Sequence, residues 1–285
     1  MTQIVNENYP LDKTSIQELK NSLIQNYNQN EIKKHNFPTE IISLPSKGLL
    51  YSEDSPLRNG TIELKYMTAS EEDILTTPSL IKQGIVLDKL FQALIVTPIK
   101  YNDLIGADKD AIMVASRILG YGKLYEATCT CPECTKESKV SFDLTQLNEK
   151  EFDIDKVEMV AANEFKFILP TTNREVTFKL LTHGDEKKIQ LDLENLKKTN
   201  KSGISKDLTT RLKSIITSID GDTNKTSIIH FVDNELFAQD SRALREHIKT
   251  ISPGIDFNMD FTCQECQYEG KLNLPVGVDF FWPGA

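Results

Sequence analysis

The sequence is poor in positive charge and has no long apolar run, and these absences exclude several classes of protein. Its 33 lysines and arginines face 42 aspartates and glutamates, giving a net charge of −9. A general binder of nucleic acid or anionic membranes would need a basic face. No apolar run approaches the length of a transmembrane helix. The first seven residues lack the basic and apolar segments of a signal peptide. We therefore expect a soluble protein made in a cytoplasm, with no nucleic-acid or membrane partner.

The sequence also lacks the motifs of the common catalytic sites. It has no glycine-rich phosphate loop, no Gly-x-Ser-x-Gly, and no His-Glu-x-x-His. The four histidines are scattered, with His183 at an expected helix start and His230 in an apolar run. Acidic pairs such as Glu71 with Glu72 fall in first helical turns, where they complement the helix dipole. We expect no enzymatic activity.

Cysteine is scarce, but its spacing is informative. Four of the five cysteines form two Cys-x-x-Cys pairs, Cys131 with Cys134 and Cys263 with Cys266. Four thiolates are the ligand set of a tetrahedral structural zinc site. Both pairs follow a threonine and precede a glutamate and a lysine at matching positions, which indicates the tip of a β-hairpin in each case. The sequence therefore predicts a closed, zinc-ribbon-like site with no open position for a catalytic water.

Other interpretations of the cysteines stay open at this point. Four thiolates also suit iron. The pairs are alternatively ordinary buried thiols, a relict site without metal, or a redox dithiol, although the last needs only one pair at a strand-to-helix junction. Cys129 corresponds to Phe261 in the second copy of the pattern. We interpret it as an apolar strand position, not a fifth ligand.

The order of motifs repeats along the chain, which favours an α+β fold of two related halves. An alternating strand over 61–66 is followed by a capping box at Thr68, and the same order recurs at 176–180 and Thr182. Asp108, expected to cap a helix that ends at 120–122, corresponds to Asp240. We infer an internal duplication with halves at 37–150 and 151–285, joined by the cysteine site. Each match alone is common enough to arise by chance.

The two ends of the chain are candidate partner-binding segments. Residues 1–36 are polar, and a helix there would place four side chains on one side: Ile16, Leu19, Leu23 and Tyr27. This segment is either a frayed tail or an arm that a partner orders. The C-terminus carries Phe280, Phe281 and the only tryptophan, Trp282. These aromatic residues either fold back onto the protein's own core or anchor a neighbouring subunit.

Four runs stand together in the first half: Leu44-Pro45-Ser46-Lys47-Gly48, residues 67–75, Ala107-Asp108-Lys109-Asp110, and residues 117–122 before the first cysteine pair. In these runs the chain resembles the T4-type bacteriophage baseplate hub protein family. The resemblance is densest over about residues 43–134 and does not include the N-terminal arm. It implies a structural component of the central hub of a contractile-tail phage baseplate, or a factor that hub assembly requires. It implies other tail proteins as partners, the virion as the final location and the host cytoplasm during assembly, and it carries over no catalytic residues.

Two other functions remain alternatives. A chaperone that builds the hub and then leaves would have the same sequence features. A zinc-ribbon adaptor acting on nucleic acid would need basic residues around the cysteine pairs, whereas both pairs carry glutamates.

Overall fold

The structure, a computed structural model, describes residues 37–150, 152, 157–199, 204–276 and 278–281. The chain divides into two compact units, residues 1–39 and 40–285. The predicted halves, 37–150 and 151–285, are not separated by this division, and their boundaries stay a prediction. None of the helices in the described ranges is both long enough and apolar enough to cross a membrane.

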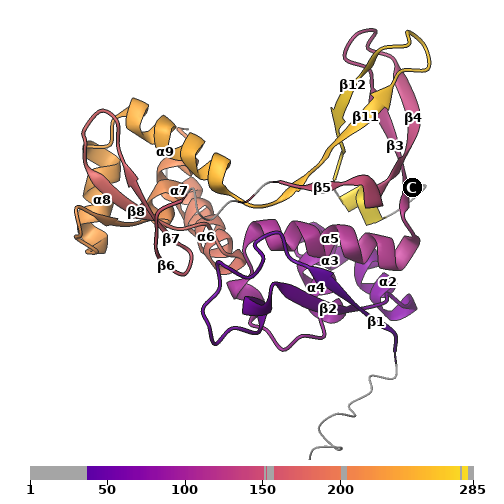
Figure 1. Cartoon of the computed structure of the whole chain (residues 1–285), viewed down its shortest axis with the longest axis horizontal. Helices are drawn as coiled ribbons and strands as arrows, with labels where there is room; N and C mark the ends of the chain where they lie inside the picture. Colours follow the sequence, from indigo (N-terminus) through magenta and orange to yellow (C-terminus); the bar gives the residue numbers. More distant parts are fainter. Residues whose placement is uncertain (1–36, 151, 153–156, 200–203, 277, 282–285) are drawn as a thin grey trace, which may run out of the picture. The chain divides into compact units, whose positions relative to one another are not determined.

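The first predicted half combines short strands with helices (Figure 1). In chain order the elements are β1 (Thr39–Ser43), η1 (Pro56–Asn59), β2 (Thr61–Lys65), α2 (Ala69–Thr76), α3 (Pro78–Lys82), α4 (Val86–Leu94), η2 (Tyr101–Asp103), α5 (Gly106–Tyr121), β3 (Leu124–Thr130), β4 (Glu137–Asp143), η3 (Leu144–Gln146) and β5 (Asn148–Glu149). The strand and helices predicted for this half are therefore present.

The second predicted half also mixes strands with helices. Its elements are β6 (Met159–Ala161), β7 (Glu164–Ile168), β8 (Glu175–Phe178), α6 (His183–Thr199), α7 (Asp207–Ile215), β9 (Ile216–Ile219), α8 (Lys225–Asn234), α9 (Ala238–Ile251), β10 (Ile255–Asp256), β11 (Asn258–Thr262), β12 (Glu269–Asn273) and η5 (Val278–Phe281). Helices and strands mixed in this way are compatible with the predicted α+β class.

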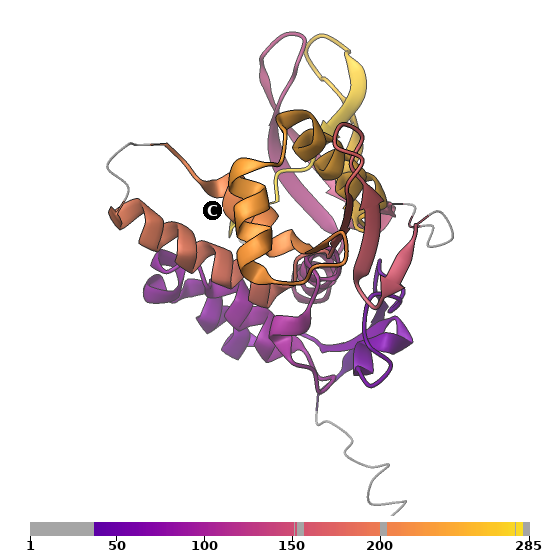
Figure 2. The ribbon, with the colours of Figure 1, turned by 90° about the vertical axis from the view of Figure 1, so that its left-hand side faces the viewer.

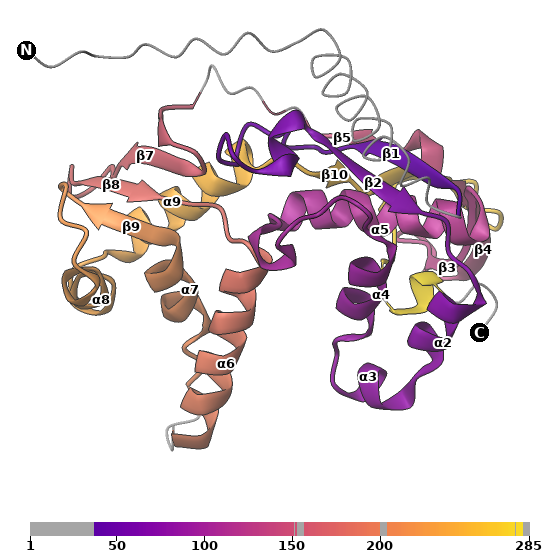
Figure 3. The same ribbon diagram turned by 90° about the horizontal axis from the view of Figure 1, so that it is seen from below.

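The strands form small antiparallel sheets. The largest has the order β6-β7-β8-β9, and the others are the pairs β1-β2, β3-β4, β5-β10 and β11-β12. Figure 3 shows β7, β8 and β9 as neighbours, with α7 and α9 beside them. The pair β5-β10 joins strands from the two predicted halves, with Ile255 opposite Glu149.

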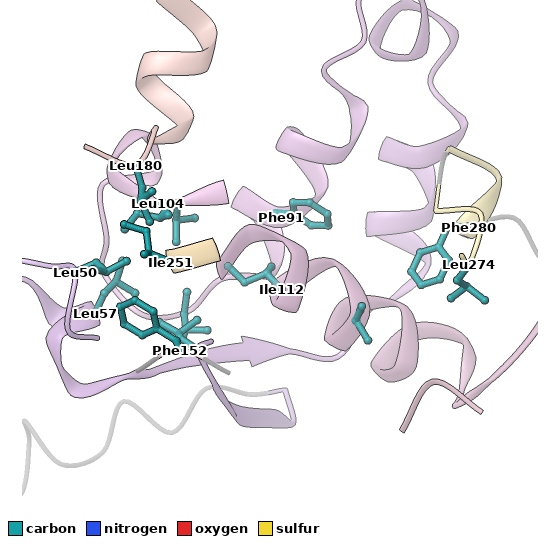
Figure 4. Close-up of a cluster of buried hydrophobic side chains, with 14 of the residues drawn as sticks. Leu50, Leu57, Phe91, Leu104, Ile112, Phe152, Leu180, Ile251, Leu274 and Phe280 are labelled. Atoms are coloured by element: carbon teal, nitrogen blue, oxygen red, sulfur yellow. The ribbon is translucent and has the colours of Figure 1, made fainter. Parts of the chain in front are cut away.

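One hydrophobic cluster extends through both predicted halves. Figure 4 shows Leu104 and Ile112 of the first half with Leu180 and Ile251 of the second in the same region. All four side chains are buried. Burial of apolar surface is worth about 25 cal/mol per Å². Because the cluster is continuous, this stabilisation joins the halves independently of the cysteine site.

The strand β2 leads into helix α2 through the predicted capping box. The Thr68 N–H and hydroxyl donate to the Glu71 carboxylate at 2.9 and 2.6 Å, and the Lys65 ammonium reaches the same group at 2.7 Å. Burial opposes ionisation of Glu71, but the hydrogen bonds from Lys65 and Thr68 outweigh it and hold the pKa of the carboxyl below its ordinary value of 4.5.

This capping network predicts a pH-dependent contribution to stability. Since the folded-state pKa of Glu71 is lowered, its contribution is complete above pH 4.5 and is lost as the pH falls through the lowered value. Replacing Glu71 with Gln should reduce the free energy of unfolding by about 1–2 kcal/mol at pH 7, and by a smaller amount as the pH falls below 4.5. Urea denaturation of both proteins at each pH measures this difference and cancels pH effects elsewhere. A difference that does not change with pH would contradict the prediction.

The strand β8 leads into helix α6 through the same arrangement. The Thr182 N–H and hydroxyl donate to the Asp185 carboxylate at 3.2 and 3.0 Å, and Lys179 lies 2.7 Å from it. The pKa of Asp185 is also lowered, because these hydrogen bonds outweigh the effect of burial. The two halves thus share a lysine, a threonine and an acid at corresponding positions.

Asp108 does not cap its own helix, contrary to the prediction. Helix α5 begins after Ile105, and Asp108 lies inside its first turn with no exposed surface. Its carboxylate accepts hydrogen bonds from the Ser46 N–H at 3.0 Å, the Ser46 hydroxyl at 2.7 Å and the Tyr51 hydroxyl at 2.6 Å. The buried acid therefore fastens a distant loop to the helix.

Asp240 has the corresponding position in helix α9 and the same role. It is fully buried and accepts from the Thr171 N–H at 2.7 Å, the Thr172 N–H at 3.2 Å and the Thr172 hydroxyl at 2.9 Å. In both halves the donors belong to the loop that follows a Leu-Pro pair. The correspondence between Asp108 and Asp240 therefore extends from sequence to contacts.

The loop held by Asp108 contains a glycine that no other residue can replace without strain. Gly48 has φ of +74°, and a Cβ there would lie 2.3 Å from the Arg58 carbonyl oxygen. Gly84 has a similar φ of +69°, but a Cβ there would meet nothing within 4 Å. Gly84→Ala should therefore cost only the conformational term of about 1–2 kcal/mol. Gly48→Ala should cost about 1–3 kcal/mol more. Thermal denaturation of the two variants checks this, and equal losses would count against it.

Candidate metal centre

The first cysteine pair lies at the tip of the hairpin β3-β4, as predicted. The strands pair from Leu124 opposite Asp143 to Thr130 opposite Glu137. At the tip the Cys131 N–H donates to the Lys136 carbonyl at 2.9 Å, and the Thr135 N–H donates to the Cys131 carbonyl at 3.0 Å. Thr135 has φ of +58°, which closes the turn.

The second pair lies in the same turn at the tip of β11-β12. The Cys263 N–H donates to the Tyr268 carbonyl at 2.9 Å, and the Gln267 N–H donates to the Cys263 carbonyl at 3.0 Å. Gln267, at the position of Thr135, has φ of +59°. Figures 1 and 2 show the two hairpins side by side with their tips at the same end. Each turn presents two sulfurs, so adjacent tips bring four together.

The four sulfurs form a compact group. The Sγ atoms of Cys131 and Cys266 are 3.7 Å apart, as are those of Cys134 and Cys263. All four lie within 4.8 Å of one another. A disulfide has an S–S distance of about 2.05 Å, so these are separate thiols. Ligands about 2.3 Å from a central zinc would be about 3.8 Å apart at the corners of a tetrahedron. The separations therefore fit four thiolates around one ion.

Burial and electrostatics also fit a metal. Cys131 and Cys263 are buried, Cys134 is partly buried and Cys266 is exposed. Hydrogen bonds from the backbone N–H groups of Cys266 and Glu265 lower the pKa of Cys263 to about 6. The Tyr268 N–H has a lowering effect on Cys266, but desolvation and the neighbouring sulfurs outweigh it and raise its pKa to about 12. Four crowded thiols cannot all ionise without a compensating positive charge, which a divalent cation would supply.

An ion pair adds a second link between the tips. The Lys136 ammonium, after the first pair, lies 2.7 Å from the carboxylate of Glu265, inside the second pair. The hydrogen bond to Glu265 raises the pKa of Lys136, and the pKa of Glu265 is lowered in return. Both side chains are more than half exposed. Such a pair contributes little to stability, so the four sulfurs are the main candidates for joining the tips.

Cys129 lies outside this group. It is buried in β3 opposite Ser138, and burial raises the pKa of its thiol. Phe261, the corresponding residue of β11, is also buried. This agrees with the interpretation of Cys129 as an apolar strand position.

The aromatic residues predicted to contact a partner are placed differently. Phe280 and Phe281 have no exposed surface. Of the two alternatives, the structure has Phe280 and Phe281 folded back into the protein's own core, so these two rings do not form an exposed anchor. Trp282 lies outside the described residues. So do the four apolar residues of the N-terminal arm: Ile16, Leu19, Leu23 and Tyr27.

Arg117 and Tyr125 make contacts with the C-terminal segment that the sequence did not predict. Arg117 is 1% exposed and donates from Nε to the Phe280 carbonyl at 2.9 Å. The Tyr125 hydroxyl donates to the Pro275 carbonyl at 3.1 Å. One feature of the sequence could have indicated the role of Arg117. It is a charged residue within the largely apolar stretch of α5, which is typical of a buried side chain that binds backbone.

The fold and the site thus define a protein of mixed helices and strands whose four paired cysteines lie together at the tips of two hairpins. Residues 44–161 match the model of a family described as T4 bacteriophage base plate protein. This segment, which is less than half of the chain, includes the first cysteine pair and supports a relationship to T4-type baseplate proteins. No curated protein and no solved structure matches the chain.

Proposed function

We propose that the protein is a structural, non-enzymatic component of a contractile phage tail baseplate. The match of residues 44–161 to the baseplate family carries this proposal. Within the baseplate we propose a position in the central hub, where the protein contacts other tail proteins. It would be made in the host cytoplasm and remain in the virion.

We further propose that Cys131, Cys134, Cys263 and Cys266 hold one structural zinc ion. The support is the sulfur geometry and the absence of any other type of ligand in the group. A bound zinc would neutralise thiolate charge and fix one hairpin to the other. It would stabilise a rigid body, since the binding energy of a structural metal acts as folding energy.

The proposed origin of this arrangement is an internal duplication. It is supported by the recurring acids that hold loops to helices, Asp108 and Asp240. It is also supported by the recurring capping acids, Glu71 and Asp185. Under this proposal each copy contributes one hairpin, and the metal joins equivalent positions of the two copies.

Mass spectrometry of purified tails tests the baseplate assignment. A resident subunit should be present in tails at a fixed ratio to the other baseplate proteins, after washing in high salt. A chaperone for the hub would be found in infected cells, bound to assembly intermediates, and would be missing from tails.

Deleting residues 1–36 should leave the fold intact and reduce tail yield, if the N-terminal arm contacts a neighbour.

A further inference from the structure

The end of the chain is bound at the base of the first hairpin by a buried arginine. Besides the Phe280 carbonyl at 2.9 Å, the Arg117 guanidinium donates to the Gly122 carbonyl at 3.1 Å and the Leu124 carbonyl at 3.3 Å. It also lies 5.2 Å from the ring centre of Tyr121. One planar group thus holds the end of α5, the start of β3 and the C-terminal segment together. A lysine could not reproduce this fork of donors.

Aromatic packing completes the attachment. The Phe280 ring meets the Tyr125 ring edge to face at a centroid distance of 4.9 Å. Phe281 lies 5.5 Å from Phe280 and 6.2 Å from Phe91 of helix α4. Figure 4 shows Phe280 beside Leu274, the residue that follows β12. The chain leaving the second hairpin is therefore held against the first predicted half.

The two hairpins consequently meet at both ends. At the tip the link is the group of four sulfurs, with Cys131 and Cys266 3.7 Å apart. At the base it is the hydrogen bond from Tyr125 to Pro275 and the burial of Phe280 and Phe281. The strands β3 and β12 run between these two places. Because an extended strand spans about 3.3 Å per residue, fixing the base of β12 restricts where the second pair of sulfurs can lie.

We propose that the C-terminal segment Val278–Phe281, bound by Arg117 and Tyr125, is a strap that sets the metal affinity of the four-cysteine centre. The inference rests on the proposed zinc site. When one ion binds between two loosely connected hairpins, the second hairpin loses conformational entropy, and this loss weakens binding. The strap removes most of that freedom before the metal arrives, so it raises the effective concentration of the second thiol pair.

The test is zinc affinity measured by competition with a chromogenic chelator, using the full chain. Phe280→Ala should weaken zinc binding by about 10- to 100-fold with unchanged stoichiometry, because the effective concentration of the second pair falls. Phe231→Ala is the matched control, since Phe231 is equally buried in α8 and its ring lies against Arg174, not against a hairpin. Its zinc affinity should stay within about 3-fold of the wild type.

Two milder variants keep the test decisive if Phe280→Ala fails to fold. Tyr125→Phe removes only the hydroxyl that binds Pro275, and Arg117→Lys keeps the charge but loses the fork. Both should weaken zinc binding by at least about 3-fold. Arg174→Lys is the control for Arg117→Lys. The guanidinium carbon of Arg174 also lies over an aromatic ring, 4.8 Å from the centre of Phe231, but in the second predicted half.

The outcomes separate the strap from the metal site itself. If the wild type binds no zinc, the proposed centre fails. If it binds zinc and the strap variants bind as tightly as their controls, the centre stands and the strap fails. Hydrogen exchange gives a second measure. In the zinc-free wild type the amides of β12 should remain protected, and Phe280→Ala should accelerate their exchange by at least about 10-fold. Equal exchange rates would also overturn the strap.

Discussion

Replacing Cys263 with serine should abolish stoichiometric zinc binding and strongly destabilise the protein. Cys263 is fully buried, and its Sγ lies 3.7 Å from that of Cys134. Structural zinc is worth about 10–16 kcal/mol in isolated zinc-finger peptides. Here a continuous hydrophobic core already joins the halves. We therefore expect the protein to stay folded and to lose part of that energy, on the order of 3–5 kcal/mol.

The matched control is Cys129→Ser. Cys129 is, like Cys263, a buried cysteine, but it lies in strand β3 of the first hairpin and outside the sulfur group. Elemental analysis should find one zinc for each chain in the wild type and in this control, and much less in Cys263→Ser. Chelation of the wild type should lower its melting temperature toward that of Cys263→Ser and leave the latter unchanged. Iron in place of zinc would be seen as a coloured protein. Full metal content in Cys263→Ser would refute the four-ligand site.

The cysteine group was predictable from sequence because most of its geometry is local. A two-residue spacer in a tight turn points both sulfurs the same way, and the flanking residues of Cys131 and Cys263 carry the same strand pattern. Only the contact between the two turns is long-range. We expected it from metal chemistry, since one cysteine pair alone cannot complete a tetrahedral site. The capping boxes at Thr68 and Thr182 were predictable for the same reason, being contacts within four residues.

The C-terminal aromatic residues could not be placed from sequence. Burial of Phe280 depends on Arg117 and Tyr125, which are more than 150 positions away. An apolar segment has the same local sequence pattern whether it is buried by its own chain or by a partner. Asp108 shows the same limit. Its position in the first turn of a helix is typical of a cap, and nothing local indicates that its acceptor oxygens serve Ser46 and Tyr51.

The difference between a cap and a buried anchor is large enough to measure. Loss of a capping side chain costs about 1 kcal/mol. Asp108→Ala would instead leave the Ser46 N–H, the Ser46 hydroxyl and the Tyr51 hydroxyl buried without their acceptor. Breaking such a buried network costs about 3–5 kcal/mol. Asp240→Ala removes three equivalent hydrogen bonds and should cost a similar amount.

Asp110→Ala provides the control on the same helix as Asp108. Asp110 is partly buried, burial raises its pKa to about 6, and it accepts none of these hydrogen bonds. Because the raised pKa means that the ionised carboxyl opposes folding, its replacement should leave the free energy of unfolding unchanged or raise it. Urea denaturation of the three variants gives the values. If Asp108→Ala and Asp240→Ala each reduce the free energy of unfolding by only about 1 kcal/mol, both residues act as ordinary caps and the prediction is wrong. A large loss for only one of them would remove the strongest contact that the proposed duplicate halves share.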